Sequence, residues 1–142
     1  MKHCLGVLLL VLAWSVSVPG FAATYTLPDG ALPSGCTRTS SVLVTCTSLN
    51  LNNNDDTIVV TSPMTLQVNG NFNYAQNVKI NQGGPASNLT FNVTGSWSGG
   101  NGGHFNASLN VANITLNQNS YVGGNLVASG TVSADTNTNQ FL

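Results

Sequence analysis

Between residues 58 and 80 the apolar side chains fall on even-numbered positions and the polar ones on odd-numbered positions. The even positions carry Ile58, Val60, Leu66, Val68, Phe72, Tyr74, Val78 and Ile80. Successive side chains of a strand leave opposite faces of the backbone, so this alternation predicts half-buried β-strands. Helical spacing is absent from the stretch, and prolines and glycines would interrupt helices. The chain is therefore expected to be all-β.

The parity of the apolar positions changes twice further along the chain. Apolar residues are odd-numbered from Leu89 to Val111 and even-numbered again from Ile114 to Ala134. Each change lies where a turn can absorb one residue. Between Leu116 and Val132 there is no Asn-Gly or Asp-Gly pair of the kind that closes tight hairpins. Consecutive hairpins are therefore not expected in this part of the chain.

Two phrases of the sequence are repeated. TLQVNGNFN (residues 65–73) and TFNVTGSWS (residues 90–98) share the same order of residue types at a step of 25 residues. A second repeat aligns the segment from Asn110 with the segment from Leu126 at a step of sixteen residues, which places Val111 on Val127 and Thr115 on Thr131. The longer step leaves room for a loop in NQGGPASN, residues 81–88.

A short repeat of alternating residues without helices predicts a right-handed parallel β-solenoid (β-helix), in which each turn of the chain forms one rung. Asn, Ser and Thr are expected to form ladders on its turns and outer faces. Trp97 shares the parity of its apolar neighbours and is assigned to the core. The residues expected to point inward include Leu66, Val68, Leu109, Leu116, Leu126 and Val132. The rival fold is an antiparallel β-sandwich in which the repeats are accidental.

The first residues have the three parts of a secretory signal peptide. Lys2 and His3 precede an apolar run over residues 4–18, and Gly20-Phe21-Ala22 places small residues at the cleavage positions. We expect cleavage after Ala22 and export to the periplasm, the cell surface or the extracellular space. The apolar run is shorter than the ~20 residues of a membrane span and no basic stop follows it, so no membrane span is expected in the mature chain.

The mature chain divides into two segments. Residues 23–56 contain two prolines, the cysteine pair and a polar run, and are interpreted as an N-terminal cap segment that covers the first rung. Residues 57–142 are interpreted as the solenoid repeats, and we expect them to be truncated at the C-terminus because the chain stops part-way through a rung. An exported chain with an even number of cysteines favours a Cys36–Cys46 disulfide, worth roughly 2.5–3 kcal/mol in the chain-entropy model.

Charge is scarce in the mature chain. Its charged residues are Arg38, Lys79, Asp29, Asp55, Asp56 and Asp135. Two basic groups cannot neutralise a phosphate backbone, so nucleic acid is not an expected partner. His104 has no cysteine near it in the sequence and is interpreted as a surface-loop residue. We therefore predict no catalytic set, no metal site and no cofactor.

One aromatic residue stands apart from the core pattern. Tyr121 breaks the parity of its neighbours, whereas Trp97 keeps it. Aromatic rings outside a core are candidates for stacking on sugars. Tyr121 is therefore the candidate exposed aromatic for binding.

The order of several phrases resembles a known family. These phrases are YTLPDGALPSGC, VTCTSLNL, DDTIVV, LQVNGNFNYAQNVKIN and SYVGGNLVASGTVSA. Together they resemble the N-terminal region of the MshQ-like proteins, which are encoded with mannose-sensitive haemagglutinin (MSHA) type IV pili, over essentially the whole mature chain. The repeats are also similar to those of bactofilins, β-solenoid polymers that lack a secretion signal and this cysteine pair.

The resemblance implies a non-enzymatic structural or adhesive protein of the cell envelope, associated with type IV pilus biogenesis. The implied partners are pilus or cell-envelope proteins. An open final rung would also allow self-association end to end. The alternative is an extracellular binding module for polysaccharide or another repetitive surface.

Overall fold

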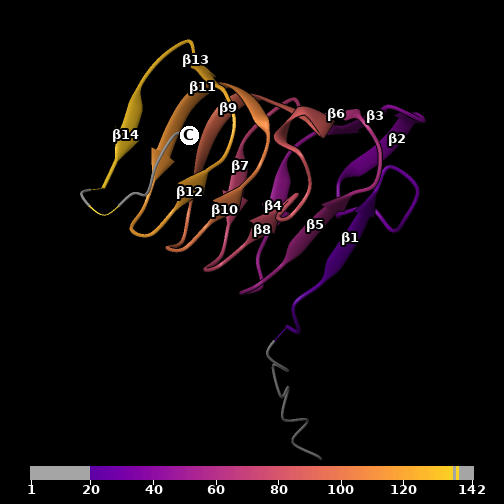
Figure 1. Cartoon of the computed structure of the whole chain (residues 1–142), viewed down its shortest axis with the longest axis horizontal. Helices are drawn as coiled ribbons and strands as arrows, with labels where there is room; N and C mark the ends of the chain where they lie inside the picture. The colour runs from indigo at the N-terminus through magenta and orange to yellow at the C-terminus, as the bar shows by residue number, and fades with distance from the viewer. Residues whose placement is uncertain (1–19, 136, 138–142) are drawn as a thin grey trace, which may run out of the picture.

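The computed structural model describes residues 20–135 and residue 137, which form a parallel β-solenoid of about four turns (Figure 1). Strands of successive coils pair in parallel, and among the described strands only β2 (Cys36–Ser40) and β3 (Leu43–Cys46) pair antiparallel. The solenoid prediction is confirmed and the sandwich alternative is wrong. The signal peptide predicted over residues 1–22 lies almost wholly outside the described residues.

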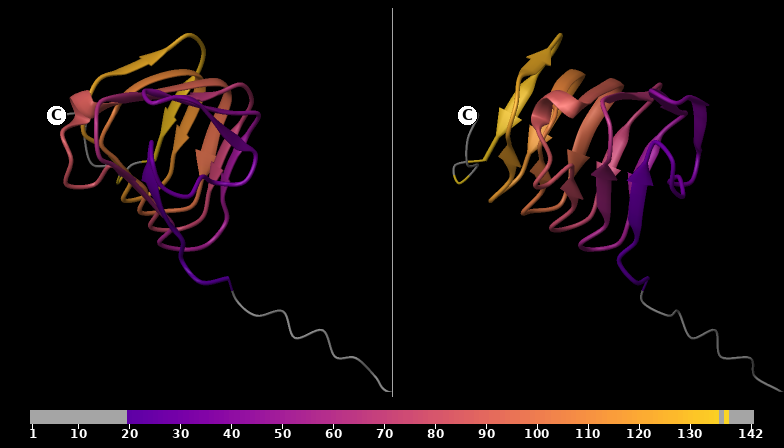
Figure 2. Two further views of the ribbon diagram at one scale, coloured as in Figure 1. Left: turned by 90° about the vertical axis from the view of Figure 1, so that its right-hand side faces the viewer. Right: turned by 45° about the vertical axis from the view of Figure 1, so that its right-hand side comes forward.

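One face of the solenoid is a five-stranded parallel sheet, which we call sheet A. Each strand comes from the next coil along the chain. In spatial order the strands are β1 (Thr24–Leu27), β5 (Thr57–Val60), β8 (Lys79–Ile80), β10 (His104–Phe105) and β12 (Tyr121–Val122). The views in Figure 2 show these coils stacked one behind another, from the indigo first coil to the yellow last one.

The remaining strands form a nine-stranded sheet, sheet B. Besides β2 and β3 it contains β4 (Leu49–Leu51), β6 (Met64–Val68), β7 (Phe72–Tyr74), β9 (Leu89–Gly99), β11 (Ser108–Leu116), β13 (Leu126–Ala128) and β14 (Val132–Ala134). The long strands β9 and β11 each pair with both short strands of a neighbouring coil, β9 with β6 and β7 and β11 with β13 and β14. A 3-10 helix, η1 (Ala86–Asn88), lies in the loop between β8 and β9.

The repeated phrase of residues 65–73 and 90–98 marks true structural equivalence. Thr65 pairs with Thr90, and Phe72 pairs with Trp97. The loop at residues 81–88, which contains η1, lies where the longer step predicted it. The step of sixteen residues is wrong, because Val111 pairs with Ala128 rather than with Val127. The step is already seventeen residues where β11 pairs with β13, and it becomes eighteen where β11 pairs with β14, so side-chain similarity alone misplaces the register.

The inner faces of both sheets supply one continuous core. Leu66, Val68, Leu109 and Leu116 are buried as predicted, and so is Trp97. Leu126 is partly buried. Val132 pairs with the buried Ile114 and so belongs to the same face, but its side chain is 48% exposed. The reason is its position on the last described coil, where no further described strand covers it.

Stacking begins earlier than residue 57. β1 pairs with β5, β3 with β6, and β4 with β7, all in parallel. Residues 24–51 therefore already form the first coil of the solenoid. Their alternate residues point into the core like those of the later coils. The part that covers this coil is β2, whose hairpin with β3 carries the Cys36–Cys46 disulfide. The Arg38 guanidinium donates to the carbonyl oxygens of Pro28 and Gly30, which fastens the loop after β1 to the hairpin.

The same corner precedes four of the strands of sheet A. The residues are Asp55, Asn77, Gly102 and Asn119, whose φ angles lie between 57° and 73°, and each lies two residues before its strand. This left-handed conformation favours Gly, Asn and Asp. The backbone N–H of Asp55 donates to the backbone carbonyl oxygen of Gln76 at 3.0 Å, and that of Asn77 donates to the backbone carbonyl oxygen of Asn101 at 2.9 Å. Each corner is thus hydrogen-bonded to the corner of the next coil.

Candidate functional site

A row of amide side chains runs across the outer face of sheet B. Gln67 on β6, Asn92 on β9 and Asn110 on β11 are in register on three neighbouring strands. The Asn92 Nδ2 donates to the Gln67 Oε1 at 3.1 Å, and the Asn110 Nδ2 donates to the Asn92 Oδ1 at 2.8 Å. We call these three residues the amide ladder. The predicted ladder of polar side chains is therefore present.

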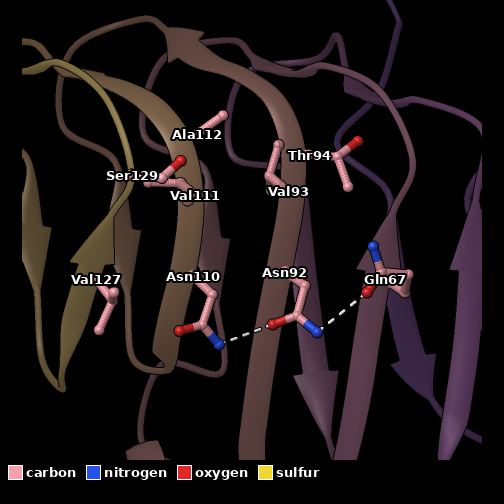
Figure 3. A pocket seen from close by; sticks show the side chains of 9 residues that line it. All are labelled: Gln67, Asn92, Val93, Thr94, Asn110, Val111, Ala112, Val127 and Ser129. Atoms are coloured by element: carbon pink, nitrogen blue, oxygen red, sulfur yellow. Dashed lines mark hydrogen bonds between the residues drawn. The ribbon is translucent and has the colours of Figure 1, made fainter.

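A shallow groove of about 340 Å³ adjoins the amide ladder (Figure 3). Its remaining lining residues are Val93, Thr94, Val111, Ala112, Val127 and Ser129. The pairing of β9 with β11 shifts register between Val111 and Asn113, and such irregularities bend a strand and redirect its side chains. The outward-facing residues next to the buried Val93 and Val111 in the sequence therefore line the same groove.

A second polar ladder lies on another part of sheet B. The Asn73 Nδ2 donates to the Asn50 Oδ1 at 3.1 Å, and the Ser98 hydroxyl donates to the Asn73 Oδ1 at 3.1 Å. None of these three residues lines the groove. This second ladder has chemistry similar to that of the amide ladder, but it lies outside the groove.

The outer face of sheet A carries a mixed row. Thr57, Lys79, His104 and Tyr121 are in register on successive strands. The Lys79 ammonium pairs with the Asp55 carboxylate at 3.1 Å. Partial burial lowers the pKa of His104 below its ordinary value of 6.5. His104 belongs to β10, so its assignment to a loop is wrong.

Tyr121, the candidate binding aromatic, is half-buried. Its ring lies against the His104 ring, with centroids 4.3 Å apart and planes tilted by 32°. One face of the Tyr121 ring is therefore already covered. A role in binding remains a prediction for this residue.

Among the described residues, three buried side-chain polar atoms have no hydrogen-bond partner. They are the Tyr74 hydroxyl, the Trp97 Nε1 and the Ser120 hydroxyl. Burial raises the pKa of Tyr74 above its ordinary value of 10.0, and the nearby Ser120 and Trp97 side chains oppose the rise. Because all three side chains belong to the core, this group is treated as a packing feature rather than a site.

The ionisable residues of the first coil have structural roles. Asp56 is buried, and its carboxylate accepts hydrogen bonds from the backbone N–H groups of Ala23 and Asn53, at 2.7 and 3.0 Å. These two bonds hold the residue before β1 against the turn before β5. Cys36 and Cys46 form the predicted disulfide, with an S–S distance of 2.05 Å. Both thiols are consumed by this bond.

Metal-binding clusters and membrane-spanning helices are both absent from the described part of the chain. No three His, Cys, Asp or Glu side chains within residues 20–135 and 137 lie close enough to hold a metal ion. Within the same residues, no helix is long and apolar enough to cross a bilayer.

The amide ladder and its groove were not singled out from the sequence. Alternation placed Gln67, Asn92 and Asn110 on outward positions, but their registration depends on steps of 25 and 18 residues between coils. The signal available in the sequence was the first repeat, which aligns Gln67 with Asn92. No protein-family model, curated protein or solved structure matches the chain. The geometry of the chain itself is therefore the basis for a functional proposal.

Proposed function

We propose that this chain is an exported, non-enzymatic structural or adhesive module of the cell envelope, associated with type IV pilus biogenesis of the MSHA kind. The observation that carries the proposal is the in-register stacking of uncharged side chains along the solenoid, as in the Gln67–Asn92–Asn110 row. Each outward amide of this row is bonded to its equivalent on the next coil, which stiffens the outer face. A stiff module with a nearly neutral face suits a spacer or an attachment element.

The cellular location is supported by two features. The N-terminal residues have the pattern of a secretory signal, and the Cys36–Cys46 disulfide is of the kind that persists in oxidising compartments. The partners proposed are pilus or cell-envelope proteins, or further copies joined end to end. Val132, an inward-facing residue that is 48% exposed on the last described coil, supports an apolar contact there.

The proposal is tested by deleting the gene in its native host. Fewer pili by electron microscopy, weaker surface attachment and unchanged growth on all carbon sources are expected. A plasmid copy should restore both properties, whereas a copy lacking residues 1–22 should not, since it would remain inside the cell. Normal piliation and normal attachment of the deletion strain would contradict the proposal.

The second candidate function is an extracellular binding module for polysaccharide or another repetitive surface. The groove beside the amide ladder favours it, since ligand sites are concave and combine apolar surface with a few placed polar groups. Normal pili and attachment in the deletion strain, together with tight binding of the isolated protein to a glycan array, would favour this function over the first.

A further inference from the structure

We infer that the groove beside the amide ladder is a binding site for a neutral polysaccharide strand, lying along the solenoid axis over Asn92 and Asn110. This inference rests on the proposed location of the protein outside the cytoplasm. It adds to the proposed function a ligand class and the residues that recognise it.

The first step concerns hydrogen-bonding capacity. A primary amide has two N–H donors and a carbonyl oxygen with two lone pairs. In the amide ladder one N–H of Asn92 donates to Gln67, and one N–H of Asn110 donates to Asn92. Each of these amides therefore keeps a second N–H and further acceptor capacity toward the groove. A ligand that both donates and accepts hydrogen bonds matches this surface, and hydroxyl groups do both.

The second step concerns charge. None of the nine side chains that line the groove is ionisable. Phosphates and carboxylates are recognised through charge-assisted hydrogen bonds from Arg or Lys, and cations through carboxylates. The groove offers neither kind of group. Its ligand is therefore uncharged.

The third step concerns shape and the apolar surface. Val127 and Ala112 present methyl groups beside the amides, whereas the side chains of Val93 and Val111, which also border the groove, belong to the core. Sugar rings combine hydroxyl edges with C–H faces, so they suit a surface of this mixed kind. From Gln67 to Val127 the groove crosses three strand spacings, roughly 14 Å at the usual separation of neighbouring strands. That length fits a short stretch of an oligosaccharide laid across the strands.

The fourth step concerns preorganisation. Asn92 is held on both sides, by Gln67 and by Asn110, and the Gln67 Nε2 in turn donates to Asn69 at 3.1 Å. Side chains that are already ordered lose little conformational entropy when a ligand binds. No aromatic ring lines the groove, so each site is expected to bind weakly, and strong attachment would come from many copies acting together on one polymer.

The experiment is a titration of the exported, isotope-labelled protein followed by nuclear magnetic resonance. The probes are cellohexaose, maltohexaose and mannohexaose, with hexagalacturonate as a charged comparison and polyethylene glycol as a polymer without internal hydroxyl groups. At least one neutral hexasaccharide should shift the side-chain amide signals of Asn92 and Asn110 saturably. The two comparison compounds should not.

Two substitutions and a matched control test whether the shifts come from binding in the groove. Asn110→Ala removes one end of the amide ladder from an exposed position and should weaken binding about five-fold or more. Ala112→Trp fills the groove without deleting a side-chain hydrogen bond and should abolish the shifts. Asn73→Ala, which breaks the second ladder outside the groove, should leave the affinity unchanged.

Several results would overturn the inference. They are the absence of saturable shifts with every neutral hexasaccharide, shifts confined to residues outside the groove, and equal weakening by Asn73→Ala and Asn110→Ala. Shifts that depend on protein concentration without any sugar would identify the groove as a contact between copies. The titration and the gene deletion test different proposals. If deleting the gene abolishes attachment but no neutral hexasaccharide shifts the amide signals, the groove inference is wrong and the proposed function stands.

Discussion

Phe72 and Trp97 occupy equivalent positions on neighbouring coils, and their rings meet nearly edge to face, with centroids 4.5 Å apart and planes at 79°. Phe72 also has ring contacts with Tyr74, Phe91 and Phe105. Phe72 and Trp97 are the rings that the repeated phrase places at equivalent positions. The repeated phrase therefore aligns these two rings across neighbouring coils, where they pack in favourable geometry.

Replacing Phe72 by Ala should lower the free energy of unfolding by about 3–5 kcal/mol, because it removes a fully buried ring from the centre of the aromatic cluster. Denaturant unfolding followed by tryptophan fluorescence measures the change. Val59→Ala is the control, since Val59 is an exposed residue of sheet A. Equal stabilities for the two variants would show that the cluster does not dominate the core.

Replacing Tyr74 by Phe should leave stability at neutral pH within about 1 kcal/mol of the wild type or raise it, because the buried hydroxyl has no hydrogen-bond partner. The difference should grow in alkali. The pKa of Tyr74 is raised in the folded state, so the unfolded chain loses this proton first, and the associated stability is present below pH 10 and lost as the pH rises toward the folded-state pKa.

Melting temperatures of both proteins between pH 8 and pH 11 test this expectation. Tyr74 is the only residue that differs between the two proteins, so the comparison isolates its contribution. Parallel curves across the whole range would mean that Tyr74 ionises as easily in the folded chain as in the unfolded one.

Replacing Asn77 by Ala should cost about 1 kcal/mol, because Asn77 has a φ of 57°, a conformation that Asn tolerates better than Ala. Asn77→Gly should be nearly neutral by the same reasoning, since glycine already occupies the equivalent corner at Gly102. Gln76→Ala, at the neighbouring exposed position, is the matched control. Thermal unfolding of the three variants measures the effect, and a similar loss for Ala and Gly would assign it to the Asn77 side chain instead.

Replacing Cys36 and Cys46 together by Ala should lower the free energy of unfolding by roughly 2.5–3 kcal/mol, the chain-entropy value for a loop of this length. The secreted wild type, denatured without reductant, should contain no thiol that iodoacetamide can alkylate in the mature chain. Reductant should bring the wild type to the stability of the double variant. Two alkylatable thiols in unreduced material would contradict the prediction.

Alternation predicted the inward face well because side-chain direction along a strand is a local property. Leu66 and Leu109 lie inside for the same reason, namely their position in an alternating strand. Val132 shows the limit of that reasoning. Its direction follows from alternation, but its burial depends on whether another strand covers it.

Register between coils was only partly predictable. The loop at residues 81–88 left a visible excess in the spacing of the first repeat. The last coil uses one residue more than the predicted step before β13 and another between β13 and β14, and no sequence pattern marks either addition. The alignment of Thr115 with Thr131 is therefore wrong, and Thr115 pairs with Ser133.

The groove could not be predicted because it depends on two independent facts. The amide ladder requires the correct register of three strands, and the hollow requires the irregular pairing between Val111 and Asn113. The first repeat marks the register of Gln67 with Asn92 but not that of Asn110, and the irregular pairing has no sequence pattern of its own. The similar chemistry of the Asn73 ladder shows that residue type alone does not identify the site.

The recurring left-handed corners at Asp55, Asn77, Gly102 and Asn119 also bear on how such a protein can change over evolutionary time. Each corner bonds to the corners next to it, and the strands of each coil pair with strands of the neighbouring coils. A tandem duplication or loss of one whole coil between two corners would preserve the disulfide hairpin and this mode of strand pairing, although ring contacts that span two coils, such as Tyr74 with Phe105, would be rearranged. Relatives of this chain are therefore expected to differ in length by entire coils, while insertions of other sizes are confined to loops such as residues 81–88.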